Sequence, residues 1–191
     1  EGKKAFWHTS AHVLAQAVKR LYPQTKCAIG PAIENGFYYD FQFAFPFSEE
    51  HLGTIEAEMR KIVKESLSLQ VYEKSREETV SFMADAGEMY KLELIWELHD
   101  AEPISFYKQG EYEELCAGPH ISNVCQIKAI KLLSVAGAYW RGSEENQMLT
   151  RIYGISFPKA AQLDEYLHMV EEAKARDHRK LGKELGIFTI F

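Results

Sequence analysis

The sequence lacks several features that would place it in whole classes of protein. No apolar run approaches the roughly 18 residues that a membrane-spanning helix needs, and the start Glu1-Gly2-Lys3-Lys4 does not have the pattern of a signal peptide. It has no phosphate-binding glycine loop of the Walker type and no internal repeat. Its three cysteines are an odd number, which argues against a disulfide framework and for a reducing compartment. We therefore expect a cytoplasmic protein that does not bind a membrane.

The chain has enough apolar material for a core. Of its 191 residues, 46% are hydrophobic and 13% are aromatic. The net charge of -6 speaks against nucleic acid, but the charge is unevenly distributed. Basic residues gather within residues 3–26 and alternate with aromatics within residues 128–151. Two interpretations therefore remain: a local basic surface that binds nucleic acid, and the simpler one of a charged face exposed to solvent.

Periodicity and turn residues predict a mixture of helices and strands. Helices are expected over residues 4–21, 48–67 and 75–87, the last opened by a capping box in Ser75-Arg76-Glu77-Glu78. Strands are expected over residues 37–43, 69–74, 104–108, 112–116, 127–140 and 148–157, with the small residues 136–138 interrupting the fifth. Residues 88–98 have no clear type. This partly segregated order predicts an α+β fold.

A last helix is expected from about Pro158. Its first half carries apolar residues, and from Glu171 to Glu184 it is highly charged, so this second half is expected to bridge to another part of the protein. The final residues, 186–191, are apolar. We interpret them as the cut start of a further part of a larger protein.

Two pairs of residues with the same spacing give the most information about the function. His8 and His12 lie at i and i+4 of the first predicted helix, so both imidazoles point into the same space. Cys116 and His120 share that spacing, but Gly118-Pro119 breaks a helix, which predicts a strand end followed by a tight loop. The two pairs can converge as a four-ligand zinc site or line a catalytic pocket without metal. Spacing alone leaves both open.

The alternative is that each histidine is an ordinary surface or core residue. The apolar stripe of the first helix consists of Val13, Leu14, Val18 and Leu21. It runs roughly opposite His8 and His12, so the core stripe does not account for the pair. The histidine face is therefore either exposed to solvent or part of a second, polar cavity.

Longer motifs carry a resemblance to a known family. They are His-Thr-Ser-Ala-His at 8–12, Ala-Ile-Gly-Pro-Ala-Ile-Glu-Asn-Gly-Phe-Tyr-Tyr-Asp-Phe at 28–41, Leu-Cys-Ala-Gly-Pro-His at 115–120, Lys-Leu-Leu-Ser-Val-Ala-Gly-Ala-Tyr-Trp-Arg-Gly at 131–142, Arg-Ile-Tyr-Gly at 151–154 and Arg-Asp-His-Arg-Lys-Leu-Gly-Lys-Glu-Leu at 176–185. Through them essentially the whole chain resembles the editing domain of bacterial-type threonyl-tRNA synthetases. The His and Cys pairs alone would also suit alanyl-tRNA synthetases, whereas residues 36–41 and 137–142 make the threonyl resemblance specific.

The resemblance implies an organisation and an activity. It implies a largely antiparallel sheet packed with helices in an editing domain of residues 1–157, a linker helix over residues 158–185 and the start of an aminoacylation domain at 186–191. The implied activity is that of an aminoacyl-tRNA deacylase within a threonine–tRNA ligase, in which an activated water hydrolyses serine wrongly esterified to threonine tRNA. A second sieve of this kind is needed because a methyl-sized difference discriminates by only about 1–3 kcal/mol.

The resemblance also implies partners and cofactors. The partner is the acceptor end of tRNA(Thr), and the chain is expected to be a monomer although the full-length protein is expected to be a homodimer. ATP, Mg and a separate zinc are expected only in the aminoacylation domain. For this chain we expect no cofactor.

Residue by residue, the resemblance implies an editing pocket of six positions. They are His8, His12, Lys91, Cys116 and His120, with Glu114 standing where the family usually has Asp. We expect His8, with Lys91 nearby, to serve the hydrolytic water and the ribose hydroxyl, and His12 to act in positioning. Cys116 and His120 are expected on the amino-acid and leaving-group side.

Three further residues are expected to bind the substrate. Tyr39 is expected in the pocket wall, and Lys128 and Arg141 are expected to meet the acceptor end, where unpaired bases invite stacking and phosphates attract cations. The longer arm of Glu114, compared with Asp, is expected to shift a hydrogen bond to the substrate amine or to a neighbouring histidine.

Three alternatives stay open. Cys116 beside a histidine is able to act as a nucleophile, although an ester to ribose is reactive enough for water. A zinc ion held by His8, His12, Cys116 and His120 would make the protein a zinc-dependent hydrolase of the alanyl-tRNA-editing type. The third alternative is a non-catalytic module that only binds the tRNA acceptor arm.

Overall fold

The computed structural model describes residues 1–99 and 103–184, so the predicted start of a further domain at residues 186–191 lies outside the described residues. The helices are α1 (Gly2–Leu21), α2 (Leu52–Lys64), α3 (Arg76–Asp85), α4 (Met89–Glu97) and α5 (Ala160–Glu184), with short 3-10 turns η1 (Glu49–His51), η2 (Val124–Gln126) and η3 (Trp140–Gly142). The strands are β1 (Lys26–Cys27), β2 (Ala32–Ile33), β3 (Gly36–Gln42), β4 (Gln70–Lys74), β5 (Ile104–Gln109), β6 (Tyr112–Leu115), β7 (Ala129–Tyr139) and β8 (Met148–Phe157). The predicted α+β class is confirmed.

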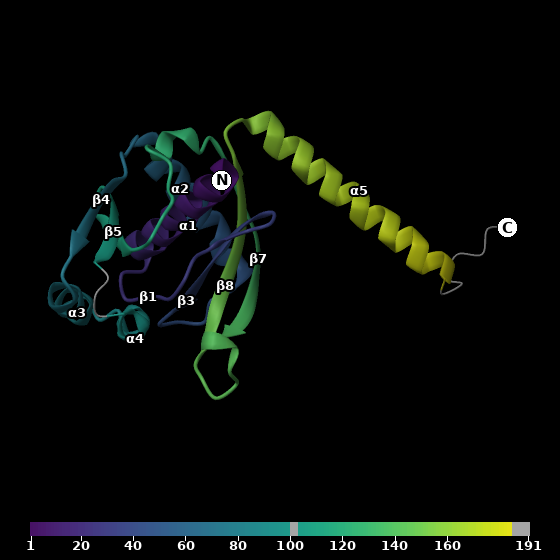
Figure 1. Ribbon diagram of the computed structural model, residues 1–191. Coiled ribbons are helices and arrows are strands. Elements are labelled where there is room, and N and C mark those ends of the chain that lie inside the picture. Colours follow the sequence, from purple (N-terminus) through teal and green to yellow (C-terminus); the bar gives the residue numbers. More distant parts are fainter. Residues whose placement is uncertain (100–102, 185–191) are drawn as a thin grey trace.

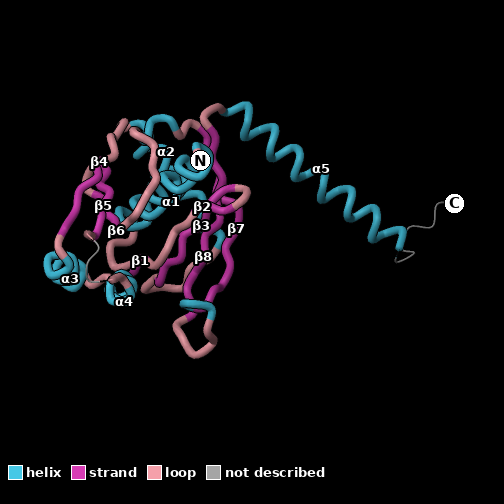
Figure 2. Tube along the Cα trace, viewed as in Figure 1, coloured by secondary structure: helices cyan, strands magenta, loops and turns pink. Residues whose placement is uncertain are grey.

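Two antiparallel sheets form the body of the molecule. The larger has the order β1-β3-β8-β7, with β2 also pairing with β3, and the smaller has the order β4-β5-β6. Figure 1 shows α1 between the two sheets and α3 and α4 beside the smaller one. The same layers appear in Figure 2, where α2 lies next to α1. Side chains that α1 directs toward the smaller sheet therefore lie between the two sheets.

Helix α1 is buried on more than its apolar stripe. Small residues such as Ala11 and Ala15 are 0% exposed, which allows neighbouring elements to approach the helix closely. His12, on the face that the periodicity set apart from the core, is only 2% exposed. Of the two alternatives for the histidine face, the structure therefore favours an internal polar site over plain solvent exposure.

The predicted interruption of the strand at residues 136–138 is wrong, because β7 is continuous to Tyr139. Gly137 faces the Met148 side chain, whose Sδ would lie 2.9 Å from an added Cβ, so the small residue makes room for a cross-strand neighbour. The real irregularity is a register shift between Leu132 and Ser134. There the backbone N–H of Leu132 donates to Oε1 of buried Glu56 at 2.9 Å.

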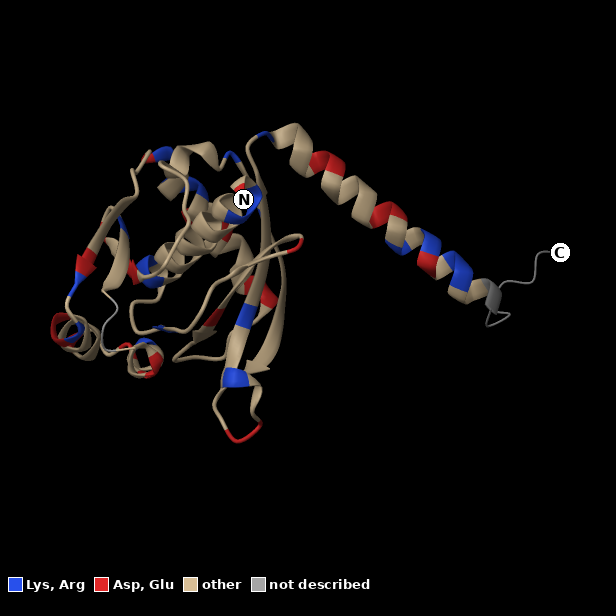
Figure 3. Cartoon of the chain, in the orientation of Figure 1, with Lys and Arg blue, Asp and Glu red and all other residues tan. Residues whose placement is uncertain are grey.

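Helix α5 leaves the body of the molecule (Figure 1). Only its beginning packs against the core, through Leu163 and Tyr166, and acidic and basic residues follow one another along its length (Figure 3). This agrees with the long C-terminal helix predicted from the sequence, while the division of the chain after residue 157 stays a prediction. Among the helices of the described ranges, none is both long and apolar enough to cross a membrane.

Candidate functional site

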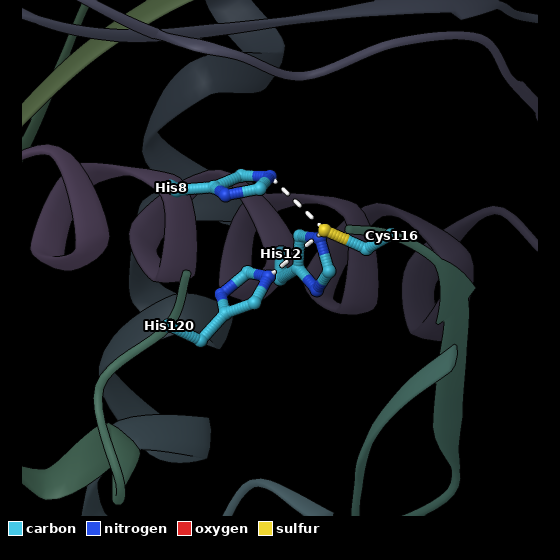
Figure 4. A group of neighbouring side chains, drawn as sticks. All are labelled: His8, His12, Cys116 and His120. Atoms are coloured by element: carbon cyan, nitrogen blue, oxygen red, sulfur yellow. Dashed lines mark hydrogen bonds between the residues drawn. The ribbon is translucent and has the colours of Figure 1, made fainter. Parts of the chain in front are cut away.

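The structure brings the two predicted pairs together. The ligand atoms of His8, His12, Cys116 and His120 all lie within 4.8 Å of one another, and Figure 4 shows the three imidazoles grouped around the Cys116 sulfur. Cys116 Sγ is 3.3 Å from Nε2 of His8 and 3.1 Å from Nε2 of His120. The His120 ring centroid lies 4.2 Å from those of both His8 and His12. We call these four residues the His/Cys cluster.

The loop that follows β6 carries the second pair into place. Gly118 has a φ of +76°, a left-handed conformation that suits glycine, and its N–H donates to Cys116 Sγ at 3.2 Å. A Cβ at this position would lie 2.5 Å from the Tyr107 hydroxyl. Because the Tyr107 ring also packs against His120 at 4.4 Å, a side chain at Gly118 would push the loop away from the cluster.

Outer hydrogen bonds fix the orientation of two imidazoles. His8 Nδ1–H donates to the Pro119 carbonyl at 3.2 Å. The Thr9 hydroxyl donates its proton to the Ala5 carbonyl. Thr9 Oγ1 also lies 2.9 Å from His120 Nδ1, and because its proton is already used it must be the acceptor there. His120 Nδ1 therefore carries the proton. When neutral, both rings therefore present an unprotonated Nε2 toward Cys116. These lone pairs can accept a proton or bind a cation.

Burial keeps the cluster uncharged near neutral pH. Desolvation is the main cause of a lowered pKa in all three histidines. It lowers the pKa of His8, and it lowers the pKa of His12 to about 4. The pKa of His120 is lowered to about 2, with the neighbouring His12 and His8 adding to the effect of desolvation. Burial also raises the pKa of Cys116 to about 12. The cluster therefore holds neutral imidazoles, which suit a general base or a metal ligand, and a thiol that is protonated and weakly nucleophilic.

A buried ion pair lies directly behind the cluster. Lys91 Nζ is 2.5 Å from Oε1 of Glu114, and the Tyr39 hydroxyl donates to the same oxygen at 2.5 Å. The other oxygen accepts from the Tyr112 hydroxyl at 2.7 Å and lies 3.3 Å from Nε2 of His12. Lys91 is 5% exposed and Glu114 is 4% exposed. Through His12, this network of Lys91, Glu114, Tyr39 and Tyr112 is joined to the His/Cys cluster.

The charge of Glu114 is held by this network. Burial alone would raise the pKa of its carboxyl group, but the attraction of Lys91 and the hydrogen bonds from Lys91 and Tyr39 lower that pKa below its usual range. His12 Nδ1 is buried and has no hydrogen-bond partner among the described residues. With Nε2–H directed at Glu114, this Nδ1 is an unsatisfied acceptor that a ligand or water could use.

A cavity of about 470 Å³ adjoins the ion pair on the side of α3 and α4. Lys91, Tyr112 and Glu114 line it, together with Gln16 and Lys19 on α1. The His/Cys cluster is not part of its lining. Lys91 and Glu114 therefore separate this cavity from the cluster.

Two predicted residues lie outside this assembly. Lys128 lines a separate cavity of about 330 Å³ together with Arg60 and Lys64. Arg141 lies in η3 at the tip of the β7–β8 hairpin and forms ion pairs with Glu93 and Glu97 of α4.

Three residues that hold the site were not predicted. Thr9 and Tyr107 fix His120, and Tyr112 binds Glu114. Only Tyr112 left a signal, because residues two apart on a strand point to the same face and Tyr112 precedes Glu114 by two. Thr9 and Tyr107 reach His120 only after distant segments have packed together.

Comparisons with known proteins show which families the chain resembles. Residues 104–153 match the family model described as "Threonyl and Alanyl tRNA synthetase second additional domain". The chain is 63% identical over 190 residues to a threonine–tRNA ligase of Caldanaerobacter subterraneus subsp. tengcongensis and 62% identical over 190 residues to one of Clostridium novyi, with 100% of the chain covered in each. A threonine–tRNA ligase of Acetivibrio thermocellus is 60% identical over 190 residues. In all three cases the chain spans 30% of the relative's length.

Proposed function

We propose that this chain, which is similar over its whole length to threonine–tRNA ligases and over residues 104–153 to the additional domain of threonyl- and alanyl-tRNA synthetases, hydrolyses serine wrongly esterified to threonine tRNA. The observation that carries the proposal is the convergence of the His/Cys cluster, joined through His12 and Glu114 to the buried Lys91 ammonium. A base with a cation in the same site suits the attack of water on an ester. In this proposal residues 1–157 form the editing unit, residues 158–185 form a linker, and the partner is the tRNA acceptor end.

His8 is proposed as the base. Its Nε2 lone pair, held free by the hydrogen bond from Nδ1–H to Pro119, takes a proton from water as the water oxygen attacks the ester carbonyl. The C–O bond to the ribose then breaks, and the ribose oxygen takes the proton back from His8. The products are serine and a tRNA with a free ribose hydroxyl.

Lys91 is proposed to stabilise the negative charge that develops on the carbonyl oxygen. Its ammonium has three N–H donors, and two are used by Glu114 and Tyr39. The third can serve the oxyanion. Glu114 binds no substrate in this scheme, because its two oxygens already serve Lys91, Tyr39, Tyr112 and His12.

Covalent catalysis by Cys116 has less support. Its raised pKa, to about 12, keeps the thiol protonated near neutral pH, whereas a nucleophilic cysteine needs a lowered pKa or a base that removes its proton. Cys116 is instead proposed to lie on the leaving-group side together with His120.

A zinc-dependent hydrolase is the second candidate, and the donor set supports it. His8, His12, Cys116 and His120 would hold the ion, and the hydrogen bonds from Nδ1 of His8 and His120 are of the kind that orients metal-binding histidines. The ion would supply a Lewis acid. Four protein ligands are, however, the pattern of a closed structural site, since catalytic zinc keeps a position open.

Serine release from seryl-tRNA(Thr) tests the proposal, with threonyl-tRNA(Thr) as the competing substrate and each reaction run with and without a strong chelator. Serine-selective hydrolysis that survives chelation, and that His8→Ala abolishes, supports water activation by His8. Hydrolysis that chelation removes and zinc restores supports the second candidate.

The matched control is His168→Ala, because His168 is an exposed histidine of α5 whose side chain is 73% accessible. It should hydrolyse seryl-tRNA(Thr) as the unaltered chain does. If the unaltered chain binds tRNA(Thr) but releases neither amino acid, hydrolysis is refuted and the acceptor-arm binding module remains.

A further inference from the structure

Helix α4 holds the only lysine of the buried network and is too short to be stable alone. It spans nine residues, Met89–Glu97, and the side chain of its N-cap residue Glu88 makes no capping hydrogen bond. Isolated helices of this length are marginal in water. The position of Lys91 therefore depends on what α4 packs against.

Two sides of α4 have different partners. At about 100° per residue, Lys91 and Ile95 fall on one side, and Tyr90, Glu93 and Glu97 fall on the nearly opposite side. Lys91 and Ile95 are buried, and Lys91 reaches Glu114 and Tyr39. The opposite side faces the β7–β8 hairpin, which lies beside α4 in Figure 1.

Trp140 makes the first contact with that opposite side. Its indole N–H donates to Oε2 of Glu93 at 2.8 Å, and its ring centroid lies 4.9 Å from that of Tyr90. The Tyr90 hydroxyl in turn donates to the side chain of Gln42 on β3 at 2.6 Å. These contacts tie α4 to both the hairpin and the large sheet.

Arg141 makes the second contact. Its guanidinium donates to Glu97 and lies 3.7 Å from Oε2 of Glu93. The residue has φ 56° and ψ 21°, a left-handed conformation that is unfavourable for a non-glycine residue and persists only where the surroundings hold it. The ion pairs with α4 hold this turn together with the hydrogen bond that Asn146 Nδ2 donates to the Trp140 carbonyl at 2.9 Å.

We propose that Trp140 and Arg141 are positioning residues that act through α4 to hold the Lys91 ammonium against Glu114 and Tyr39. The inference rests on the proposed function, because it gives Lys91 a part in the hydrolysis. The sequence predicted that Arg141 contacts the tRNA acceptor end. The proposal gives it a different role, in which the guanidinium binds carboxylates of the protein itself. Disturbing it moves the lysine and leaves RNA binding unchanged.

The kinetic test compares variants of the full chain. Arg141→Ala should lower kcat for seryl-tRNA(Thr) by about ten- to a hundredfold, the effect of displacing a catalytic group by up to an ångström, and leave KM within about twofold, since no substrate contact is lost. The charge exchange Arg141→Glu with Glu97→Arg should restore most of kcat. Arg176→Ala, which removes an exposed arginine paired with Glu172 on α5, should change neither. A raised KM with unchanged kcat and a weaker salt dependence would overturn the proposal in favour of an RNA contact.

A second measurement does not depend on hydrolysis. The rate at which an amine-reactive reagent modifies Lys91, read by mass spectrometry, should rise at least about tenfold in Arg141→Ala and in Trp140→Phe, because the buried ammonium is released. Arg176→Ala should leave that rate unchanged, and thermal melting should show that every variant is folded at the temperature used. An unchanged Lys91 rate in both hairpin variants overturns the positioning role. If the unaltered chain does not hydrolyse seryl-tRNA(Thr), the proposed function fails, while Lys91 protection still decides whether the hairpin holds the lysine.

Discussion

Replacing Lys91 with methionine should destabilise the protein strongly. The substitution keeps an apolar stem of similar length but removes the ammonium, and it leaves the Glu114 carboxylate, only 4% exposed, without its counter-charge. Removing one partner of a buried ion pair typically costs about 3–5 kcal/mol. The hydroxyls of Tyr39 and Tyr112 still donate to Glu114, so we expect a loss near the lower end, about 3 kcal/mol of the free energy of unfolding.

The double variant separates the ion pair from the loss of packing. Lys91→Met combined with Glu114→Gln removes both charges, and the remaining amide oxygen can still accept a hydrogen bond from a tyrosine hydroxyl. We expect the double variant to be more stable than Lys91→Met alone, with a coupling free energy of about 2 kcal/mol or more. Lys61→Met is the control, because the Lys61–Glu58 pair has a lysine side chain that is 72% exposed and such pairs contribute little.

The pH dependence supplies a further check. In the unaltered protein the pKa of Glu114 is lowered below 4.5, so this group adds stability above that pH and loses it as the pH falls. Without Lys91, burial dominates and raises the folded-state pKa above the unfolded value. The penalty in Lys91→Met is then largest near pH 7 and shrinks as the pH falls through that raised pKa, where Glu114 becomes neutral.

Urea unfolding followed by tryptophan fluorescence at pH 7 and pH 5 measures all of these quantities. A loss below about 1 kcal/mol for Lys91→Met, or single-variant losses that simply add in the double variant, would refute the buried, coupled ion pair. A penalty that is the same at both pH values would refute the assignment of the cost to the Glu114 charge.

Three other changes test other parts of the structure. Gly118→Ala places a Cβ 2.5 Å from the Tyr107 hydroxyl at a φ of +76°. We expect urea unfolding to show a loss of about 1–3 kcal/mol in the free energy of unfolding. Unchanged stability would contradict the loop geometry. The pKa of His12 is lowered from 6.5 to about 4, so as the pH falls the unfolded chain takes up a proton before the folded chain does. The free energy of unfolding therefore falls between those pH values, by up to about 3 kcal/mol. His12→Asn should show a smaller fall, and an equal fall would exclude His12 as its source. Arg20→Met removes ion pairs with Glu58, Glu65 and Glu111. We expect a loss of about 1 kcal/mol at low salt that shrinks at high salt. A loss independent of salt would show that packing is its cause.

Local signals predicted much of the fold. The capping box at Ser75 and Glu78 is present in the structure, and α1 and most strands follow their periodicity. Residues 88–98 gave no clear type because α4 is only nine residues long and its apolar residues are not confined to the buried side, since Met89 and Trp96 are exposed. A helix with apolar residues on both its buried and its exposed sides has a blurred hydrophobic periodicity.

The candidate site was predictable in its parts but not in its arrangement. The equal spacing of the two pairs predicted that they could converge, and the structure places them within 4.8 Å. Spacing does not predict the network behind them, since Lys91 and Glu114 come from α4 and β6 and meet only when those elements come together in the fold. Nor does spacing reveal that Arg141 would find its partners on α4.

The proton on Cys116 links the two chemical interpretations of the site. With its pKa raised to about 12, the thiol can donate a hydrogen bond to Nε2 of only one of the two neighbouring imidazoles, His8 or His120, at any moment. If the proton is shared with His120, Nε2 of His8 stays free to act as the base. A zinc ion would instead have to displace that proton, because only the thiolate binds the metal, so zinc affinity would rise steeply with pH. The protonation state of this one sulfur therefore decides whether the four residues are arranged for proton transfer or for metal binding.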